Sequence, residues 1–406
     1  MIDSPVDVPT GCSGFSRRSF FRFAAGASAL ASMPILTEAH LAFAQRPQFA
    51  DPNKGIHIDA NENPLGPSEG ARKAIIDVLP IGGRYRFEMQ DDLARTFATI
   101  EGLNPEWVLP FAGSSDPLHY TVLAFTDKSK PLIIADPGYE APIWAAKVSG
   151  AEVIKVPLAD PKGEASHDMK AMLAASSTPG VIYICNPNNP TGTVTSRADI
   201  EYAVAKAPKG TILLIDEAYI HLSDMQSSLD FVKDGKDVIV LRTFSKLYGM
   251  AGIRMGLAIA RPELLAKYNA FGMNPLPITA MAAAKASLLD KELVPSRKKI
   301  IGDVRVETLS WLKSNGYSFT PSVSNCFMVE TGRPGNQVLA AMAAKEIFIG
   351  RIWPAWPTQV RVTVGTRDEM IAFRNAFKEV MATNTAGLEP ARRPGRLAEH
   401  PFTHLS

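Results

Sequence analysis

The chain has 406 residues, of which 46% are hydrophobic and 21% are charged, and its formal net charge is +2 at pH 7. This length allows two lobes with a large buried core, and the composition is ordinary for a globular protein. The small net charge, without any run of like charges, gives no sign of nucleic-acid binding. The three cysteines, Cys12, Cys185 and Cys326, lack metal-ligand spacing, so we expect no metal site. Cys185 and Cys326 lie in separate apolar runs that are expected to be buried, so we expect no disulfide between them.

The amino terminus has the features of a twin-arginine export signal. Arg17 and Arg18 precede an alanine-rich apolar stretch over residues 23–36, and residues 42–44 (AFA) have the small-x-small pattern that signal peptidase cleaves. The alternatives are a basic amphipathic extension or a short membrane anchor, but the apolar stretch is too short to span a bilayer. We therefore expect export through the twin-arginine translocase and a periplasmic protein that begins near Gln45, without stable membrane anchoring.

The next segments alternate between loops and helices. Residues 56–58 predict a short strand, and residues 60–67 (ANENPLGP) predict a loop because they are dense in turn formers. Ser68 stands where a helix cap is expected. Residues 111–117 (FAGSSDP) open a further helix, with its proline where an early helical proline is tolerated. The free backbone N–H groups at that helix start are suited to binding a phosphate.

Short apolar runs and helical patterns then alternate through the middle of the chain. Each run ends in polar residues, which parallel strands would bring together at one edge of a sheet. This pattern predicts an α/β fold with a mainly parallel sheet. The expected strands cover residues 132–135, 152–156, 181–185, 212–215, 238–241 and 254–260.

A second, smaller lobe is expected after the sheet. A long helix from Leu293 leads to strand candidates at 326–330 and 360–364 and to a final helix over 368–381. The expected organisation is a signal peptide (1–44), an N-terminal arm with part of the small domain (45–84), a large cofactor-binding domain (85–290), a C-terminal small domain (291–382) and a mobile tail (383–406).

One lysine stands out by its position. Lys246 closes the sequence Thr243-Phe244-Ser245-Lys246, directly after the apolar run 238–241. A lysine at the end of a buried strand is costly to desolvate unless it is paired or used chemically. One use is a Schiff base with an aldehyde cofactor, whose phosphate nearby hydroxyls and an arginine would hold. The alternative is an ordinary solvated surface lysine.

Four motifs, in this order, resemble those of fold-type I pyridoxal-phosphate aminotransferases, most closely the histidinol-phosphate aminotransferase family. They are residues 61–66 (NENPLG), 186–192 (NPNNPTG), 216–219 (DEAY) and 243–246 (TFSK). The resemblance extends over about residues 59–377. It implies the fold of type I pyridoxal-phosphate-dependent transferases, with a large domain around a mainly parallel sheet and a smaller α+β domain. It also implies pyridoxal 5'-phosphate as cofactor and a homodimer with shared active sites.

The resemblance implies a role for the residues of each motif. Lys246 would bind the cofactor and move a proton between substrate and cofactor, while Asp216 would face the pyridine nitrogen. Tyr219 and Asn189 would hydrogen-bond the phenolic oxygen, and Tyr139 would stack on the ring. The phosphate would be held by Ser114, Ser115, Thr243, Ser245, Arg254 and, from the second subunit, Tyr85.

The same resemblance implies the substrate contacts. Arg361 would grip the substrate carboxylate through its planar fork, with Asn325 in support. Asn63, in the first motif, is a further candidate for substrate binding. Arg351 matches an arginine that would hold the phosphate of histidinol phosphate.

Residues 352–356 (IWPAW), which follow Arg351, are bulky and apolar, so they either line an aromatic side-chain pocket or pack structurally. Export also argues against histidine biosynthesis, which is cytoplasmic. We therefore expect an exported aminotransferase that acts on an amino acid, aromatic or otherwise bulky, and a 2-oxo acid. A C–S lyase or an amino-acid oxidase is the alternative, because the same cofactor supports both. A genuine histidinol-phosphate aminotransferase is a further alternative, and the presence of Lys246, Asp216 and Arg361 disfavours a non-catalytic binding protein.

Overall fold

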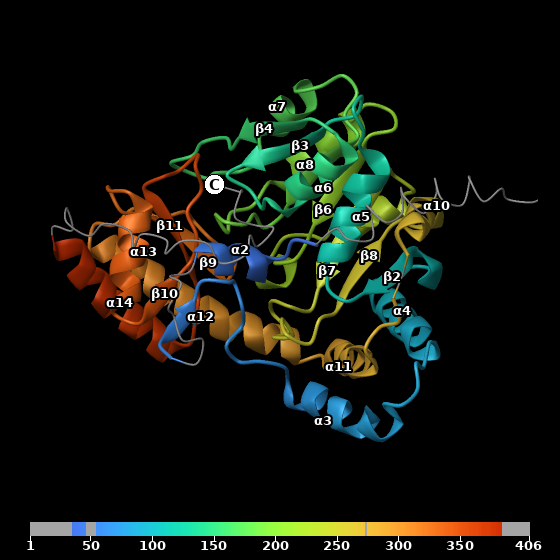
Figure 1. Cartoon of the computed structure of the whole chain (residues 1–406), viewed down its shortest axis with the longest axis horizontal. Helices are drawn as coiled ribbons and strands as arrows, with labels where there is room; N and C mark the ends of the chain where they lie inside the picture. Colours follow the sequence, from blue (N-terminus) through green and yellow to red (C-terminus); the bar gives the residue numbers. More distant parts are fainter. Residues whose placement is uncertain (1–34, 46–53, 273, 384–406) are drawn as a thin grey trace, which may run out of the picture. The chain divides into compact units, whose positions relative to one another are not determined.

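The computed structural model describes residues 35–45, 54–272 and 274–383 of the chain. Its centre is a seven-stranded sheet in the order β2-β8-β7-β6-β5-β3-β4 (Figure 1). Strand β8 runs antiparallel to both neighbours, and the other neighbouring pairs are parallel. The strands are β2 (Val108–Phe111), β3 (Leu132–Asp136), β4 (Val153–Pro157), β5 (Val181–Cys185), β6 (Ile212–Asp216), β7 (Val238–Thr243) and β8 (Gly256–Ile259).

Helices connect the strands, and several of them pack on the sheet. Every residue of β5, β6 and β7 is buried, which explains why these strands are continuous apolar runs rather than alternating ones. The helices of this part are α3 (Glu69–Val78), α4 (Glu88–Glu101), α5 (Ser115–Phe125), α6 (Ala141–Ser149), α7 (Met169–Ala174), α8 (Arg197–Lys206), α9 (Leu229–Lys233), α10 (Pro262–Leu265) and α11 (Ile278–Leu289).

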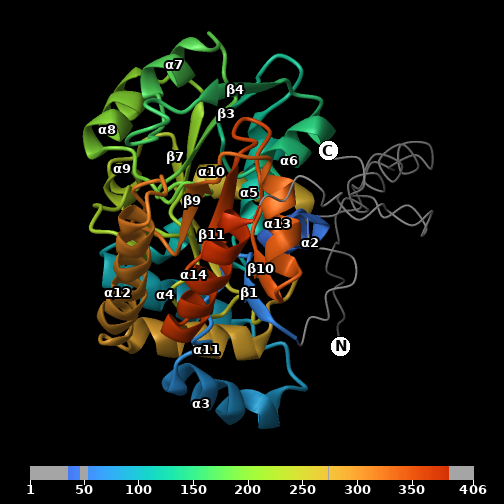
Figure 2. The ribbon, with the colours of Figure 1, turned by 90° about the vertical axis from the view of Figure 1, so that its left-hand side faces the viewer.

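A second group of elements follows α11. Strand β9 pairs antiparallel with β11, and β1 pairs parallel with β10. Figure 2 shows these short strands together with α13 and α14 on one side of the molecule. The elements are β1 (Ile56–Ile58), α12 (Leu293–Ser314), β9 (Cys326–Glu330), α13 (Gly335–Ala343), β10 (Ile347–Ile349), β11 (Gln359–Thr363) and α14 (Arg367–Ala382).

The mainly parallel α/β sheet predicted from the sequence is confirmed. The Ser68 cap is also confirmed, since its hydroxyl accepts from the Ala71 N–H at 3.2 Å. Two strands were not predicted. Strand β2 contains Pro110 and lies at the sheet edge, where a proline costs no ladder hydrogen bond, and β10 has only three residues. Short strands of this kind carry little periodic signal.

The amino-terminal prediction falls partly outside the described residues. Arg17, Arg18 and most of the expected tail, residues 384–406, lie there, and the structure says nothing of them. Residues 38–45 form the helix α2 (Glu38–Gln45), which contains the predicted cleavage sequence at 42–44. Across the described ranges, no helix is long and apolar enough to cross a membrane.

Candidate active site

A cavity of about 440 Å³ lies where the carboxyl ends of β5, β6 and β7 meet the start of α5. This is the edge at which parallel α/β sheets bind their ligands, and the volume suits a small molecule. Ten of the residues singled out in the sequence line this cavity: Ser114, Ser115, Tyr139, Asn189, Asp216, Tyr219, Thr243, Ser245, Lys246 and Arg254.

Lys246 lies just past β7 with its side chain buried in the cavity wall. Its Nζ is 3.5 Å from the carbonyl oxygen of Ala60 and 5.6 Å from the ring centre of Tyr219. Burial lowers the pKa of the Lys246 amine, the nearby Glu38 carboxylate opposes this shift, and Arg361 adds to it. An amine whose pKa is lowered is more often neutral, as a nucleophile and proton carrier must be.

Asp216 is the last residue of β6, and its carboxylate is held by neutral donors. The Tyr183 hydroxyl donates to Oδ2 at 2.9 Å, and the Ala218 N–H donates to Oδ1 at 3.1 Å. Burial raises the pKa of Asp216 to about 6 against these hydrogen bonds and against the charge of Lys246. A carboxylate in this position favours a cationic ligand group beside it. Tyr183 was not predicted, because an aromatic residue inside a buried strand reads as core.

A second buried pair fixes the ends of β6 and β7 relative to each other. The Arg242 Nε donates to Glu217 Oε2 at 2.8 Å, and the Ser228 N–H donates to Glu217 Oε1 at 2.6 Å. Arg242 Nη1 also lies 3.0 Å from His221 Nε2. Burial, and to a smaller extent the positive charge of Arg242, lowers the pKa of His221 to about 3, so this imidazole is neutral. Glu217 follows Asp216 in the sequence, and Arg242 lies near the end of β7. The network therefore helps to position both Asp216 and the segment after β7.

An anion cradle forms at the start of α5. The Thr243 hydroxyl donates to Ser245 Oγ at 3.0 Å, and Arg254 Nη1 donates to the same oxygen at 3.3 Å. Ser114 and Ser115 stand at the amino end of the 11-residue α5, where free N–H groups and the helix dipole favour an anion. Gly113, with φ of +95°, lets the Arg254 guanidinium lie against the loop, where a Cβ would overlap it. These groups fit a phosphate dianion.

Arg361 and Arg351 are buried behind the residues that line the cavity, 0% and 1% exposed. Arg361 Nη1 donates to Asn189 Oδ1 at 2.9 Å, and its Nη2 donates to the Asp59 carbonyl at 2.5 Å. Arg351 Nη2 lies 3.1 Å from Glu140 Oε2. The Nε atoms of both arginines have no hydrogen-bond partner among the described residues. Two neighbouring buried guanidiniums favour an anion beside them.

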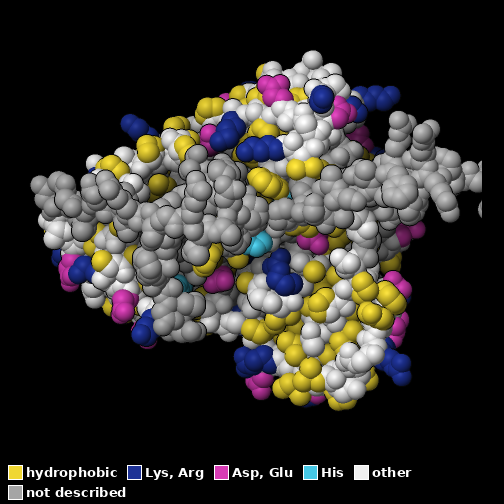
Figure 3. All heavy atoms as spheres, in the orientation of Figure 1, with side chains coloured by type: hydrophobic (Ala, Val, Ile, Leu, Met, Phe, Trp, Pro, Cys, Tyr) yellow, Lys and Arg dark blue, Asp and Glu magenta, His cyan; other side chains and the backbone are white. Residues whose placement is uncertain are grey.

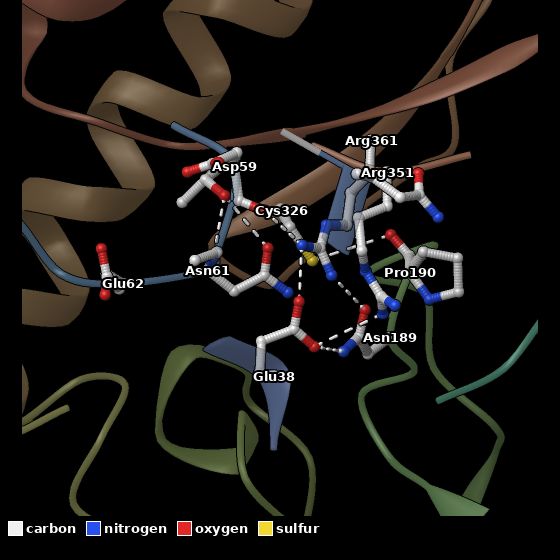
Figure 4. Close-up of polar contacts among 12 residues, drawn as sticks. Glu38, Asp59, Asn61, Glu62, Asn189, Pro190, Cys326, Arg351 and Arg361 are labelled. Atoms are coloured by element: carbon white, nitrogen blue, oxygen red, sulfur yellow. Dashed lines mark hydrogen bonds and ion pairs between the residues drawn. The ribbon is translucent and has the colours of Figure 1, made fainter. Parts of the chain in front are cut away.

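Glu38 enters this arginine pair from α2, as Figure 4 shows. Its Oε1 is 2.7 Å from Arg361 Nη2, and its Oε2 is 3.5 Å from Arg351 Nη2. Asn189 Nδ2 donates to the same Oε2 at 3.0 Å. Glu38 was not among the predicted site residues, because residue 38 lies in the expected leader. The Asn189 amide, expected at the cofactor's phenolic oxygen, is thus engaged by Glu38 and Arg361 here.

The remaining predicted residues lie outside the cavity lining. The Asn63 side chain donates to the Leu247 carbonyl at 2.8 Å and accepts from the Leu65 N–H at 3.1 Å, so it braces the lysine segment rather than facing a ligand. Asn325 Nδ2 donates to the carbonyls of Asn61 at 3.2 Å and Glu62 at 3.3 Å. It therefore holds the loop that follows β1.

The two tryptophans after Arg351 pack structurally. The Trp353 ring, 1% exposed, lies under Arg351 with the guanidinium carbon 4.5 Å from its ring centre. Its Nε1 donates to the Gly138 carbonyl at 2.9 Å. Trp356 packs on a separate cluster that contains Leu158. Residues 352–356 were expected either to line an aromatic side-chain pocket or to pack structurally, and the two tryptophans pack structurally. Cys185 and Cys326 are buried free thiols.

The comparisons with known proteins agree with this geometry. The sequence matches the family described as aminotransferase class I and II over residues 53–377. It is 32% identical to the histidinol-phosphate aminotransferase of Symbiobacterium thermophilum over 333 residues, 80% of this chain and 90% of that protein. It is 30% identical to the aromatic amino acid aminotransferase of Cutibacterium acnes over 316 residues, 76% of this chain and 88% of that protein.

The fold has a matching relative among solved structures. The histidinol-phosphate aminotransferase from Sinorhizobium meliloti, in complex with pyridoxal 5'-phosphate, superposes with a TM-score of 0.75. The match covers 91% of this chain and 98% of that chain, at 24% identity.

Proposed function

Since the chain belongs to the aminotransferase class I and II family, we propose that its cavity binds pyridoxal 5'-phosphate and transfers an amino group from an aromatic or otherwise bulky amino acid to a 2-oxo acid. One observation carries this proposal: a single cavity is lined by a buried amine, a buried carboxylate and an anion cradle, and two buried arginines contact its lining residue Glu38. When bound, the cofactor supplies a ring that stabilises negative charge at the substrate α-carbon.

The chain's own residues would divide the work as follows. Ser115, Ser245 and Arg254 would hold the phosphate at the start of α5, and the Asp216 carboxylate would keep a proton on the ring nitrogen. The Lys246 amine would anchor the cofactor and then carry a proton to and from the α-carbon. Arg361 would hold the substrate carboxylate, which orients the α-hydrogen toward that amine.

The choice of donor rests on the relatives and on the arginine pair. The relatives carry the names of histidinol-phosphate and aromatic amino acid aminotransferases. Arg351 is already paired with Glu140 at 3.1 Å, and this ion pair lowers the affinity of Arg351 for a substrate phosphate. The test compares kcat/KM for aromatic amino acids and histidinol phosphate with one 2-oxo acid acceptor. We expect the aromatic donors to be faster, and a preference for histidinol phosphate would reverse the assignment.

Lyase or oxidase chemistry is the second candidate, because the same cofactor residues support it. Ammonia, sulfide or peroxide released without any 2-oxo acid acceptor would establish it. Aminotransfer instead gives no net turnover until the acceptor is present. The product assay therefore separates the two classes with one preparation.

We also propose export to the periplasm through the twin-arginine pathway. Its support is the order Arg17-Arg18, an apolar stretch and residues 42–44 (AFA). Replacing both arginines by lysine should keep the protein in the cytoplasm at its full length. Unchanged periplasmic delivery of that variant would overturn the export proposal.

A homodimer with shared sites is proposed from an exposed apolar surface. Ile76, Leu79, Tyr85 and Phe87 are 63%, 58%, 72% and 61% exposed. Figure 3 shows hydrophobic side chains gathered where Figure 1 places α3, α4 and α11. A patch of this kind on a folded protein marks an interface. Tyr85 lies outside the cavity of its own chain, so it reaches a phosphate only from a second subunit.

Mixed dimers test this arrangement. Tyr85→Ala and Lys246→Ala subunits should each be nearly inactive alone. Random co-assembly should restore about a quarter of the wild-type activity, since half the dimers would have one intact site of two. If hybrid dimers form but activity is not restored, the shared-site arrangement is wrong. Either Tyr85 and Lys246 of the same chain then belong to one site, or Tyr85 does not belong to the site.

The raised pKa of Asp216 predicts how the cofactor-free protein responds to pH. The folded state keeps the Asp216 proton up to a pKa of about 6, whereas the unfolded chain releases it near pH 4. The free energy of unfolding should therefore fall by about 3 kcal/mol as pH rises from 4 to 6, and this loss should then level off. Urea denaturation of wild type and Asp216→Asn measures it. Parallel pH profiles for the two proteins would contradict the prediction.

A further inference from the structure

Glu38 stands where the proposed function places a substrate carboxylate. Its carboxylate contacts Arg361 Nη2 at 2.7 Å and Arg351 Nη2 at 3.5 Å, and it accepts from Asn189 Nδ2 at 3.0 Å (Figure 4). Burial raises the pKa of this carboxyl, but Arg351, Arg361 and Lys246 outweigh burial and bring the pKa to about 2. Glu38 is therefore an anion at any physiological pH.

The contact does not use the full capacity of the arginines. Glu38 meets each guanidinium through one Nη atom, and both Nε atoms lack a partner among the described residues. On Arg361, Nη2 also donates to the Asp59 carbonyl and Nε is buried, so Glu38 holds this guanidinium through a single ion pair. A free carboxylate at the same place would make the same contact with Arg361, so it competes with Glu38 for this guanidinium.

The rest of the segment is docked at both ends. Leu36 is buried, and its N–H donates to His119 Nε2 at 3.2 Å. Burial lowers the pKa of His119 to about 4, which leaves Nε2 free to accept. At the other end, the Gln45 side chain accepts from the Ile352 N–H at 3.0 Å and donates to the Ile352 carbonyl at 3.4 Å.

We propose that residues 36–45 are an intramolecular plug, in which Glu38 occupies the substrate-carboxylate position of the uncleaved chain until the leader is removed. This inference rests on the proposed function, because it takes Arg361 as the carboxylate-binding group. An eight-residue helix is not stable by itself in water, so α2 keeps its shape only while docked. Tethering gives Glu38 a high effective concentration, and it competes with free substrate.

The position of the cleavage sequence couples opening to maturation. Residues 42–44 (AFA) lie within α2, and Ala42 is 3% exposed. A peptidase needs an extended, accessible chain, so it can cut here only after α2 has left the cavity. Cleavage after Ala44 removes Glu38 with the leader and leaves the arginine pair open to substrate.

Succinate binding to the cofactor-loaded full chain tests the plug without any turnover. Isothermal titration should show that Glu38→Gln binds succinate at least tenfold more tightly than wild type. Leu36→Ser keeps the carboxylate but weakens the docking, so it should also bind more tightly. Phe43→Ser is the matched control in the same helix, since Phe43 is 73% exposed, and it should match wild type. Equal or weaker succinate binding by both Glu38→Gln and Leu36→Ser would overturn the plug.

Limited proteolysis by elastase, which cuts after small residues, gives a second readout. Cleavage at residues 42–44 should be slow in wild type and should accelerate with saturating succinate or with Glu38→Gln. Cleavage rates that stay the same with succinate and with Glu38→Gln would contradict the inference. The two proposals can fail separately. If the variants bind succinate more tightly but no aminotransfer occurs, the plug is supported and the proposed function is wrong. If aminotransfer occurs but the variants bind succinate as wild type does, the function is supported and the plug is wrong.

Discussion

Lys246→Ala is expected to lower kcat by at least about 10⁴-fold, because one amine serves as both covalent anchor and proton carrier, and proton transfer alone contributes about 10²- to 10⁴-fold. The cofactor should still bind, since the phosphate cradle around Ser245 and Arg254 is untouched. Steady-state kinetics with a measured cofactor content for each preparation gives both quantities.

Lys285→Ala is the matched control for that substitution. Lys285 lies on α11, forms an ion pair with Asp92 at 2.5 Å and does not line the cavity. Its loss should leave kcat within about twofold, since surface ion pairs contribute little. A Lys246→Ala protein that keeps more than a hundredth of the wild-type kcat would show that another group moves the proton.

Arg361→Ala, made together with Glu38→Gln, is expected to lower kcat/KM for an amino acid by roughly 30- to 5000-fold. Removing one partner of a buried, hydrogen-bonded charge pair costs about 2–5 kcal/mol. The second substitution is needed because Arg361→Ala alone would leave the Glu38 carboxylate buried beside an empty space. Kinetics of this double variant, measured against Glu38→Gln alone, isolates the contribution of Arg361.

An amine donor provides the internal control for Arg361. A phenylalanine analogue without its carboxylate, phenylethylamine, has nothing for the guanidinium to hold. Its kcat/KM should change less than about threefold, so the loss should be confined to donors with a carboxylate. Equal losses for the amino acid and the amine would mean that Arg361 supports the fold of the site rather than the substrate.

Local sequence was sufficient for six of the seven strands of the sheet and for the floor of the cavity. Asp216 ends a buried apolar strand and Lys246 lies three residues past the end of another, and parallel strands bring such positions to one edge of the sheet. The cradle at Ser114 and Ser115 was likewise visible as a helix start. These features depend on contacts within a few residues or on neighbouring strands.

Features built from distant segments were not predictable. The Glu38 contact with Arg361 joins residues 323 positions apart, and nothing in the sequence around Glu38 distinguishes it from a leader residue. Asn63 was expected at the substrate because it lies in a recognisable motif, yet its amide bonds Leu247. The sequence showed that these residues carry chemistry or structure, but only the packed fold decides which.

The central claim is tested most directly by a single turnover without acceptor. The cofactor-loaded protein is mixed in air-saturated buffer with one aromatic amino acid, and 2-oxo acid, ammonia and peroxide are quantified. We expect one equivalent of 2-oxo acid per active site, no ammonia and no peroxide, with further turnover only after a 2-oxo acid acceptor is added. Continuous product formation without the acceptor, accompanied by ammonia, would contradict it.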